Sequence, residues 1–457
     1  MKKWLLLALL SGTAAHADML DALRAYEQKN YTEAQQQFAE LLPLGNELAA
    51  FNLGVMAYQG EGQAQDLVKA LAFFQLAAEL EHQQSAGLVA QLSAKATAEQ
   101  QQLASQYFLQ LKTQVVITPT DLTLQNDDVG LLPLKRAEPR YPIDAARKGI
   151  FGYVAVRFII DEAGKVTAVD TMDAFPEKVF EKETIKAVKK WRYEATGQKH
   201  VQRVRLDYSL GGYVQSPQFD DVVNKLELWT YSLAGSPSHQ LALGTVLSLA
   251  EVQGQNQLEF DDNLPLGSQP DFSIYKKAVQ LKPEFDGFWG QATVQVDENG
   301  VITEQFKAQF EPGNKLKTLI GERFSGEIVA GKYRIDRYDR NYMRDVVITP
   351  VLSVSNAMSG KFWWEQAAKN GNLEAQRVMA AYDKQWEKHL LNQQDAEVMA
   401  WTGTRLILEG QREQGMLLLA AGQTSFDWKV VVSLFQQFGV GILLGLAGGW
   451  VLLNLIN

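Results

Sequence analysis

A strict alternation of side chains between residues 152 and 160 (GYVAVRFII) most constrains the fold of this chain. A period of two residues is typical of a β-strand, because successive side chains point to opposite faces of a sheet. One face carries four apolar residues: Val154, Val156, Phe158 and Ile160. Residues 161–164 (DEAG) predict a hairpin turn with glycine at a position that needs a positive φ. Residues 165–172 are then the returning strand.

An amphipathic helix and a third strand follow this hairpin. Residues 176–191 place apolar or small side chains on one helical face: Phe180, Thr184, Ala187, Val188 and Trp191. Gly197 ends this segment, and residues 200–210 alternate again. The expected order over residues 133–212 is strand, strand, helix, strand.

The ordered motifs of residues 133–212 resemble the TonB C-terminal domain. They cover about 80 of the 457 residues. The resemblance rests on Pro139, Tyr141, Pro142, Ala145, Gly149, Ile150, Gly152, the alternating residues 154–158, Asp161, Gly164, Phe180, Ala187 and Trp191-Arg192-Tyr193. In that family, a short peptide from an outer-membrane transporter adds a strand to the last strand of the domain, and backbone pairing at the sheet edge holds it.

The resemblance implies that the docking strand here spans residues 201–210. Alternation predicts that Gln202, Val204, Leu206 and Tyr208 face one side, and Val201, Arg203, Arg205 and Asp207 the other. The candidate partner-binding residues are Val201, Gln202, Arg203, Val204, Arg205, Leu206, Tyr208, Tyr141 and Pro142. The Tyr141-Pro142 corner is expected to fix the start of the domain first and to contact a partner second, because proline restricts itself and its predecessor.

Helical segments flank this module. Residues 18–112 and 355–425 show helical spacing and resemble Sel-one-like repeats, relatives of the tetratricopeptide repeat. The clearest copy is carried by Leu53, Gly54, Tyr58, Gly60, Gly62, Asp66, Ala70, Phe73 or Phe74, Ala77 and Ala78. The family implies a scaffold that binds other periplasmic proteins; the alternative is a purely structural role.

The remaining interior is less regular. Residues 113–132 predict a linker, residues 213–284 a mainly helical region, and residues 285–352 a β-rich region. A turn at residues 297–300 (DENG) echoes the turn at 161–164, so a degenerate second copy of the module is an alternative to an unrelated sheet. The fold class is therefore multidomain α+β, with helical repeats around a small TonB-like domain, a second β-rich region and a C-terminal transmembrane helix.

The two ends of the chain predict export and membrane anchoring. Residues 1–17 have two lysines, an apolar run and small residues, which is typical of a signal peptide; an uncleaved anchor is the alternative. Residues 430–456 carry no charge and are long enough to cross a membrane; a buried helix is the alternative. We expect a periplasmic protein of a Gram-negative bacterium, anchored to the inner membrane by this C-terminal helix.

The composition excludes several functions. The net charge is −9, which argues against nucleic acid as a partner. There is no cysteine, and the histidines lack metal-ligand spacing. Asp336, Asp339 and Asp345 alternate with arginines, and a charge-paired strand is expected there rather than a calcium site. We expect no enzyme: no catalytic residue, no cofactor and no metal.

Two functions remain. The first is an energy transducer of the TonB family, with an outer-membrane transporter peptide and a proton-driven inner-membrane motor as partners. The second is a membrane-anchored periplasmic scaffold that uses no energy. The family anchors itself at the N-terminus and has a long proline-rich spacer, whereas this chain has a C-terminal anchor candidate and 13 prolines.

Overall fold

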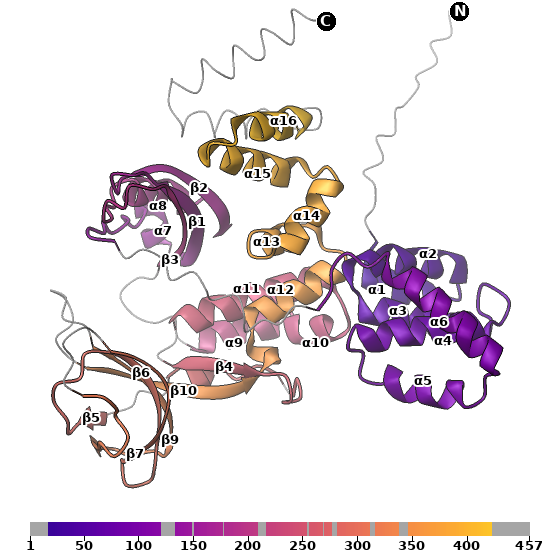
Figure 1. The fold of residues 1–457 in the computed structure, drawn as a ribbon, viewed down its shortest axis with the longest axis horizontal. Coiled ribbons are helices and arrows are strands. Elements are labelled where there is room, and N and C mark those ends of the chain that lie inside the picture. The colour runs from indigo at the N-terminus through magenta and orange to yellow at the C-terminus, as the bar shows by residue number, and fades with distance from the viewer. Residues whose placement is uncertain are drawn as a thin grey trace, which may run out of the picture.

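Two larger sheets and a two-stranded one are attached to a body of helices in the computed structural model of this protein (Figure 1). The structure describes residues 17–119, 133–148, 150–176, 178–208, 216–253, 256–267, 269–276, 281–310, 316–337 and 346–422. The predicted mixed α+β, multidomain architecture is confirmed.

The N-terminal helices, of which four begin at a hydrogen-bonding polar cap, form the first group. They are α1 (Met19–Glu27), α2 (Tyr31–Leu41), α3 (Glu47–Gln59), α4 (Leu67–Glu79), α5 (Ser85–Ser93) and α6 (Ala98–Lys112). Asp66 accepts a hydrogen bond from the Lys69 N–H and so begins α4. Gly54 on α3 lies against the Phe74 ring of α4, because a Cβ there would be 2.8 Å from that ring. These helices therefore pack closely in pairs.

A second group of helices continues the body. It contains α9 (Ser216–Lys225), α10 (Leu228–Leu233), α11 (Pro237–Gln253), α12 (Gly360–Lys369), α13 (Leu373–Ala380), α14 (Lys384–Asn392), α15 (Ala396–Leu408) and α16 (Arg412–Gly422). Helices α11 and α12 touch through Gly244 and Gly360, where a Cβ on either would lie within 2.7 Å of the other's carbonyl oxygen. All the strands of the second β-rich region lie in the chain between these two helices.

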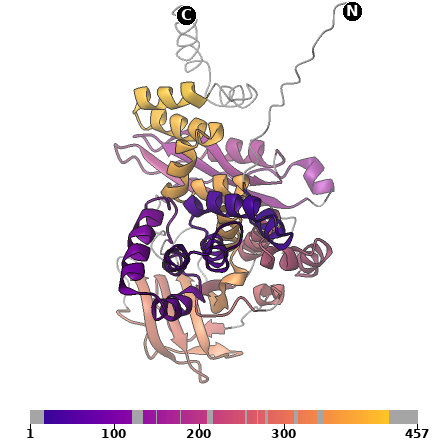
Figure 2. The same ribbon diagram turned by 90° about the vertical axis from the view of Figure 1, so that its right-hand side faces the viewer.

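Helices from both ends of the chain share one hydrophobic core, which includes Phe38 from α2 and Trp386 from α14. Buried amides join the two groups: the Asn46 Nδ2 donates to Asn370 Oδ1 at 2.7 Å and to the Lys369 carbonyl at 2.9 Å. In Figure 1 the sheet of residues 152–208 lies above α9 and α11 and the sheet of residues 257–355 lies below them, both on the side away from the N-terminal helices. Figure 2 shows the same two sheets one above the other.

The predicted linker is wrong at its start. The N–H groups of Val116 and Ile117 both donate to the Pro43 carbonyl, and Ile117 is buried. Residues 113–119 therefore belong to the N-terminal helices, because a buried isoleucine and two backbone bonds fix them. Residues 120–132 lie outside the described part of the chain.

The first sheet has the order β2-β1-β3 and is antiparallel throughout. Its strands are β1 (Gly152–Ile160), β2 (Val166–Phe175) and β3 (His200–Tyr208), and its helices are α7 (Ile143–Arg147) and α8 (Glu181–Val188). The observed order of strand, strand, helix and strand follows the pattern of the sequence.

The second sheet has the order β4-β10-β9-β6-β7. Its strands are β4 (Gln257–Asp261), β6 (Gly290–Val296), β7 (Ile302–Phe310), β9 (Gly331–Arg337) and β10 (Val347–Ser355), beside the small pair β5 (Leu281–Pro283) and β8 (Phe324–Gly326). Strand structure thus begins earlier and ends later than residues 285–352. The reason is that β4 pairs in parallel with β10, a contact between distant segments that local periodicity does not reveal.

The predicted signal peptide and transmembrane helix fall almost wholly on residues 1–16 and 423–457, which lie outside the described residues. Among the helices that the structure describes, none combines the length and the hydropathy needed to cross a membrane.

Candidate partner-docking site

The β1–β2 turn is held by one aspartate. The Asp161 carboxylate accepts hydrogen bonds from the N–H groups of Ala163 and Lys165 at 3.1 and 2.8 Å. Gly164 has a φ of +77°, which favours glycine. The Gly164 carbonyl accepts from the Tyr193 N–H at 2.8 Å, so the turn is also tied to the chain that leads into β3.

Helix α8 covers one face of the sheet with the residues that the sequence places on its apolar side. Phe180, Thr184, Ala187, Val188 and Trp191 are all buried. The Trp191 indole N–H donates to the Ala137 carbonyl at 2.9 Å, and its ring meets Phe158 edge to face. This face is therefore filled by the domain's own core.

The Tyr141-Pro142 corner has a structural role in this arrangement. The Tyr141 hydroxyl donates to the Ile150 carbonyl at 2.5 Å, and its ring packs edge-on against Phe180 and Tyr208. Burial raises the pKa of Tyr141, so its hydroxyl stays a donor near neutral pH. Pro142 immediately precedes α7. Both residues fix the path of the chain next to the end of β3.

The two faces of β3 alternate as the sequence predicts, and the first of them is core. Leu206 and Tyr208 are buried beneath α8, with Val204 partly buried against the same core. The Tyr208 hydroxyl hydrogen-bonds Thr184 Oγ1 at 2.5 Å, and burial raises its pKa to about 12. These three side chains therefore stabilise the domain rather than present themselves to a partner.

The other face of β3 is fastened to the helical body through Arg205. Its guanidinium stacks over the Tyr153 ring at 3.8 Å, pairs with Asp207 at 3.0 Å and donates to both oxygens of Ser248 on α11. Burial raises the pKa of Asp207, although Arg205 opposes this shift. Sequence reasoning missed this clamp. The signal was Tyr153, a large ring on the face of β1 opposite Val154 and Phe158.

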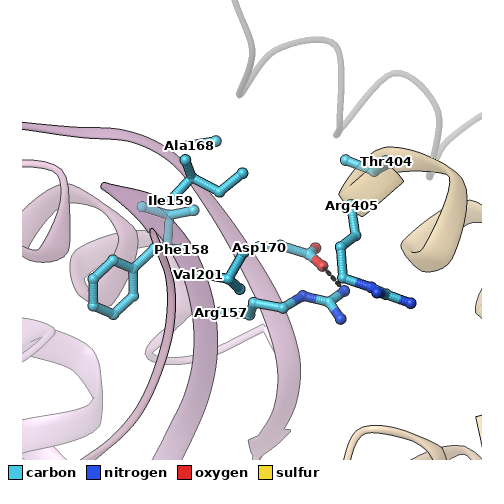
Figure 3. Close-up of a pocket in the computed structure, with 9 residues that line it drawn as sticks. Arg157, Phe158, Ile159, Ala168, Asp170, Val201, Thr404 and Arg405 are labelled. Atoms are coloured by element: carbon cyan, nitrogen blue, oxygen red, sulfur yellow. Dashed lines mark hydrogen bonds and ion pairs between the residues drawn. The ribbon is translucent and has the colours of Figure 1, made fainter. Parts of the chain in front are cut away.

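The body also covers the rest of that face. Ala155 of β1 packs with Met172 of β2 against Ala381, which follows α13. Further along, Arg157 and Asp170 form a buried ion pair at 2.9 Å that points toward Arg405 on α15 (Figure 3). Burial raises the pKa of Asp170, and the adjacent Arg157 opposes the shift. The sheet is therefore enclosed on both faces.

Within the described residues, what stays open is the outer edge of the two end strands, β2 and β3. Strand β3 pairs with β1 on one side, and no other strand in the described part of the chain pairs with its second side. Arg203 is exposed, while Val201, Gln202, Val204 and Arg205 are half-buried. An unpaired edge presents N–H and C=O groups to any extended peptide, so this arrangement suits strand addition.

Residues 137–210 match the family model for the Gram-negative bacterial TonB protein C-terminal region. They form a TonB C-terminal domain. Protein TonB of Yersinia enterocolitica is 42% identical over 70 residues, which are 15% of this chain and 28% of that protein. Protein TonB of Salmonella typhimurium is 42% identical over 66 residues, 14% of this chain and 27% of that protein. This chain thus spans less than a third of the length of either relative.

Two solved structures are also similar to this chain. The solution structure of the Pseudomonas aeruginosa TonB C-terminal domain is 27% identical, covers 19% of this chain and 92% of its own, and has a TM-score of 0.17. The TonB2 protein of Vibrio anguillarum is 32% identical, covers 21% of this chain and 94% of its own, and has a TM-score of 0.16.

Proposed function

We propose that this protein binds an extended peptide of an outer-membrane transporter at β3, and that this docking serves energy transduction in transmembrane transport. The observation that carries the proposal is the edge of β3 in a TonB C-terminal domain whose two sheet faces are both covered. A partner that cannot reach a face can still pair with the backbone.

A docked strand would meet only some of the predicted residues. The exposed Arg203 and the half-buried Val201 and Gln202 lie near the start of β3. They would contact the partner's side chains. Leu206 and Tyr208, being buried, contribute through their backbone alone. Affinity would therefore come mainly from main-chain hydrogen bonds, with specificity set near Arg203.

The helical body would replace the spacer of the family. Arg205 bonded to Ser248, and β1 and β2 packed beside α13 and α15, connect the domain to the body on two sides. A pull on β3 would pass into packed helices rather than into a flexible chain. Contact with a proton-driven motor would then be made by another part of the protein.

The setting that fits this role is the periplasm. We propose that residues 1–17 direct export, that residues 430–456 anchor the chain in the inner membrane, and that the helix pairs are Sel-one-like repeats that bind other periplasmic proteins. The proposal includes no catalytic role.

The scaffold is the second candidate, and one observation favours it. Helices from the two ends of the chain share one core and are joined by Asn46 and Asn370. A rigid body of this kind is suited to holding partners in fixed positions, and it needs no energy source.

Photo-crosslinking in living cells separates the two candidates. A photoreactive amino acid replaces Arg203, and the trapped partner is identified by mass spectrometry with and without a protonophore. The matched control replaces Arg334 on β9, a strand paired on both sides. Transporters trapped from position 203 only in energised cells would support transduction. Periplasmic partners that the protonophore leaves unchanged would refute it and leave the scaffold.

A further inference from the structure

The turn of the second sheet repeats the turn of the TonB domain bond for bond. The Asp297 carboxylate accepts from the N–H groups of Asn299 and Val301 at 2.9 and 2.8 Å, two and four residues further on, as Asp161 does in the first turn. Gly300 has a φ of +79°, against +77° at Gly164. Asx turns are common, so this likeness alone would decide nothing.

The likeness extends to a contact made far along the chain. The Gly300 carbonyl accepts from the Phe324 N–H at 2.8 Å, as the Gly164 carbonyl accepts from Tyr193. Both aromatic residues are buried, and both follow an arginine that bridges to the residue after the turn glycine. Such a contact depends on the fold and not on the turn, so it is independent support.

The strand order and the first glycine also agree. Strands β7-β6-β9 are antiparallel neighbours in the same order as β2-β1-β3. Each first strand begins at a glycine, Gly152 or Gly290, where a Cβ would be within 2.0 Å of a carbonyl oxygen near the end of the returning strand. The chain approaches through Pro139-Arg-Tyr141 in one case and Pro283-Glu-Phe285 in the other.

Two differences separate the regions. The described residues 316–323, between β7 and β8, contain no helix, and a fully buried Leu319 fills part of the core instead. The strand that corresponds to β3 is β9, and its outer side is not open. Strand β10 pairs with it antiparallel, from Val347 opposite Asp336 to Val351 opposite Lys332.

We infer that residues 281–337 are a second, degenerate copy of the TonB C-terminal domain, and that β10 of the same chain occupies the edge that corresponds to the docking edge of β3. Strand β10 is then an added strand on a complete three-stranded module. It brings an apolar Ile348 opposite the buried Ile335, and its second half pairs with β4 at the helical body. The inference does not require the proposed transporter.

This arrangement makes a specific claim about stability. If β10 is an addition, β6, β7 and β9 keep their structure when β10 leaves, and the freed β9 accepts an extended peptide. Pro350 has no N–H, so it fits this ladder only where its nitrogen faces away from β9. Because direction alternates along a strand, Thr349 then presents its N–H to β9. Thr349→Pro removes that donor, and Thr349→Ala keeps it.

The test is hydrogen exchange with mass spectrometry on the full chain. In Thr349→Pro, we expect exchange at β9 to rise at least tenfold, while β6, β7 and the first sheet stay as in the wild type and Thr349→Ala changes nothing. A synthetic peptide of residues 347–355 (VITPVLSVS) should restore the protection of β9 in the proline variant.

Three outcomes would overturn the inference: β9 exchange that the proline does not change, loss of protection throughout β6 and β7, or a peptide that restores nothing. Should Thr349→Pro fail to fold, Ile348→Ala replaces it. This milder variant shortens the half-buried Ile348 side chain and so weakens the packing of β10 against β9. It should raise exchange at β9 several-fold and leave β6 and β7 unchanged; a uniform rise across the sheet would contradict the inference.

Discussion

Strands β1 and β6 occupy the same place in two modules of one molecule, yet their surroundings differ. All nine residues of β1 are buried, whereas buried and half-buried residues alternate along β6. The two sequences account for this difference. Strand β1 (GYVAVRFII) has apolar residues on both faces, whereas β6 (GQATVQV) has polar residues on one face. The second face of a small sheet thus decides whether the module is embedded in the body.

The outer edges of β3 and β9 differ in the opposite sense to the faces of β1 and β6. The embedded module leaves β3 unpaired on one side within the described residues, and the module with the more exposed face has β10 on the corresponding edge. Each module is therefore accessible where the other is covered. Matched substitutions in the two modules test this contrast.

The largest difference in stability loss between the two modules is expected on replacing Trp191 and its counterpart Glu322 by alanine. Trp191→Ala empties a buried ring site and leaves the Ala137 carbonyl without its donor, which should cost about 3–5 kcal/mol. Glu322→Ala should stay within about 0.5 kcal/mol, because its side chain is half-exposed. Hydrogen exchange of the β1 and β6 amides measures both local stabilities. Equal losses would mean that the modules do not differ in this way.

The next contrast lies between Arg157 and Thr293 on the second faces of β1 and β6. Arg157→Ala leaves the buried Asp170 carboxylate unpaired and should cost about 3–5 kcal/mol, whereas Thr293→Ala should cost under about 0.5 kcal/mol. Burial raises the pKa of Asp170 in the folded protein. Its ionisation therefore lowers the free energy of unfolding at neutral pH, and this cost disappears below the usual pKa of 3.8.

The loss in Arg157→Ala should therefore shrink as the pH falls toward 4. Urea unfolding of the variant across pH checks this. The matched control Arg157→Met/Asp170→Leu, which removes both charges, should be close to wild type. A loss that does not depend on pH would rule out the buried carboxylate as its cause.

A smaller effect should be the same in both modules. Gly164→Ala and Gly300→Ala place a Cβ at a positive φ and within 2.5 Å of a carbonyl oxygen, so each should cost about 2 kcal/mol. The exchange rates of the two hairpins measure this. Gly197 has a φ of +73° but nothing within 4 Å of an added Cβ. Gly197→Ala therefore measures the cost of the positive φ alone, and it should destabilise the protein less than the other two substitutions. Unequal losses of stability at residues 164 and 300 would argue against the inference that residues 281–337 are a second copy of the domain.

The smallest expected effect is the loss of the Asp297 turn contacts at acid pH. Hydrogen bonds from the Val301 and Asn299 N–H groups lower the pKa of Asp297, so the ionised carboxylate supports the turn. This support is complete above the usual pKa of 3.8 and is lost as the pH falls through the lowered value. The NMR shift of the Val301 amide should follow that titration and become independent of pH in Asp297→Asn. A shift that is constant in the wild type would contradict the turn geometry.

Local patterns predicted the elements, and long-range contacts decided the site. Alternation and turn chemistry predicted the β1–β2 hairpin, and helical spacing predicted the buried side of α8 at Phe180 and Trp191. The covering of Tyr153 and Arg157 by α11 and α15 could not be predicted, because those helices begin far away in the sequence. The pairing of β10 with β4 was hidden for the same reason. The turn at 297–300 gave only a hint of a second copy of the module.

Peptide docking at β3, and its exclusion from β9, is tested most directly by comparing the two strands in the full chain. A peptide copying the N-terminus of an outer-membrane transporter from the same bacterium is added, and hydrogen exchange is followed at both strands. We expect new protection at residues 200–205 of β3, with β9 unchanged because β10 already occupies its edge. Protection on β9, or none on β3 at saturating peptide, would contradict it.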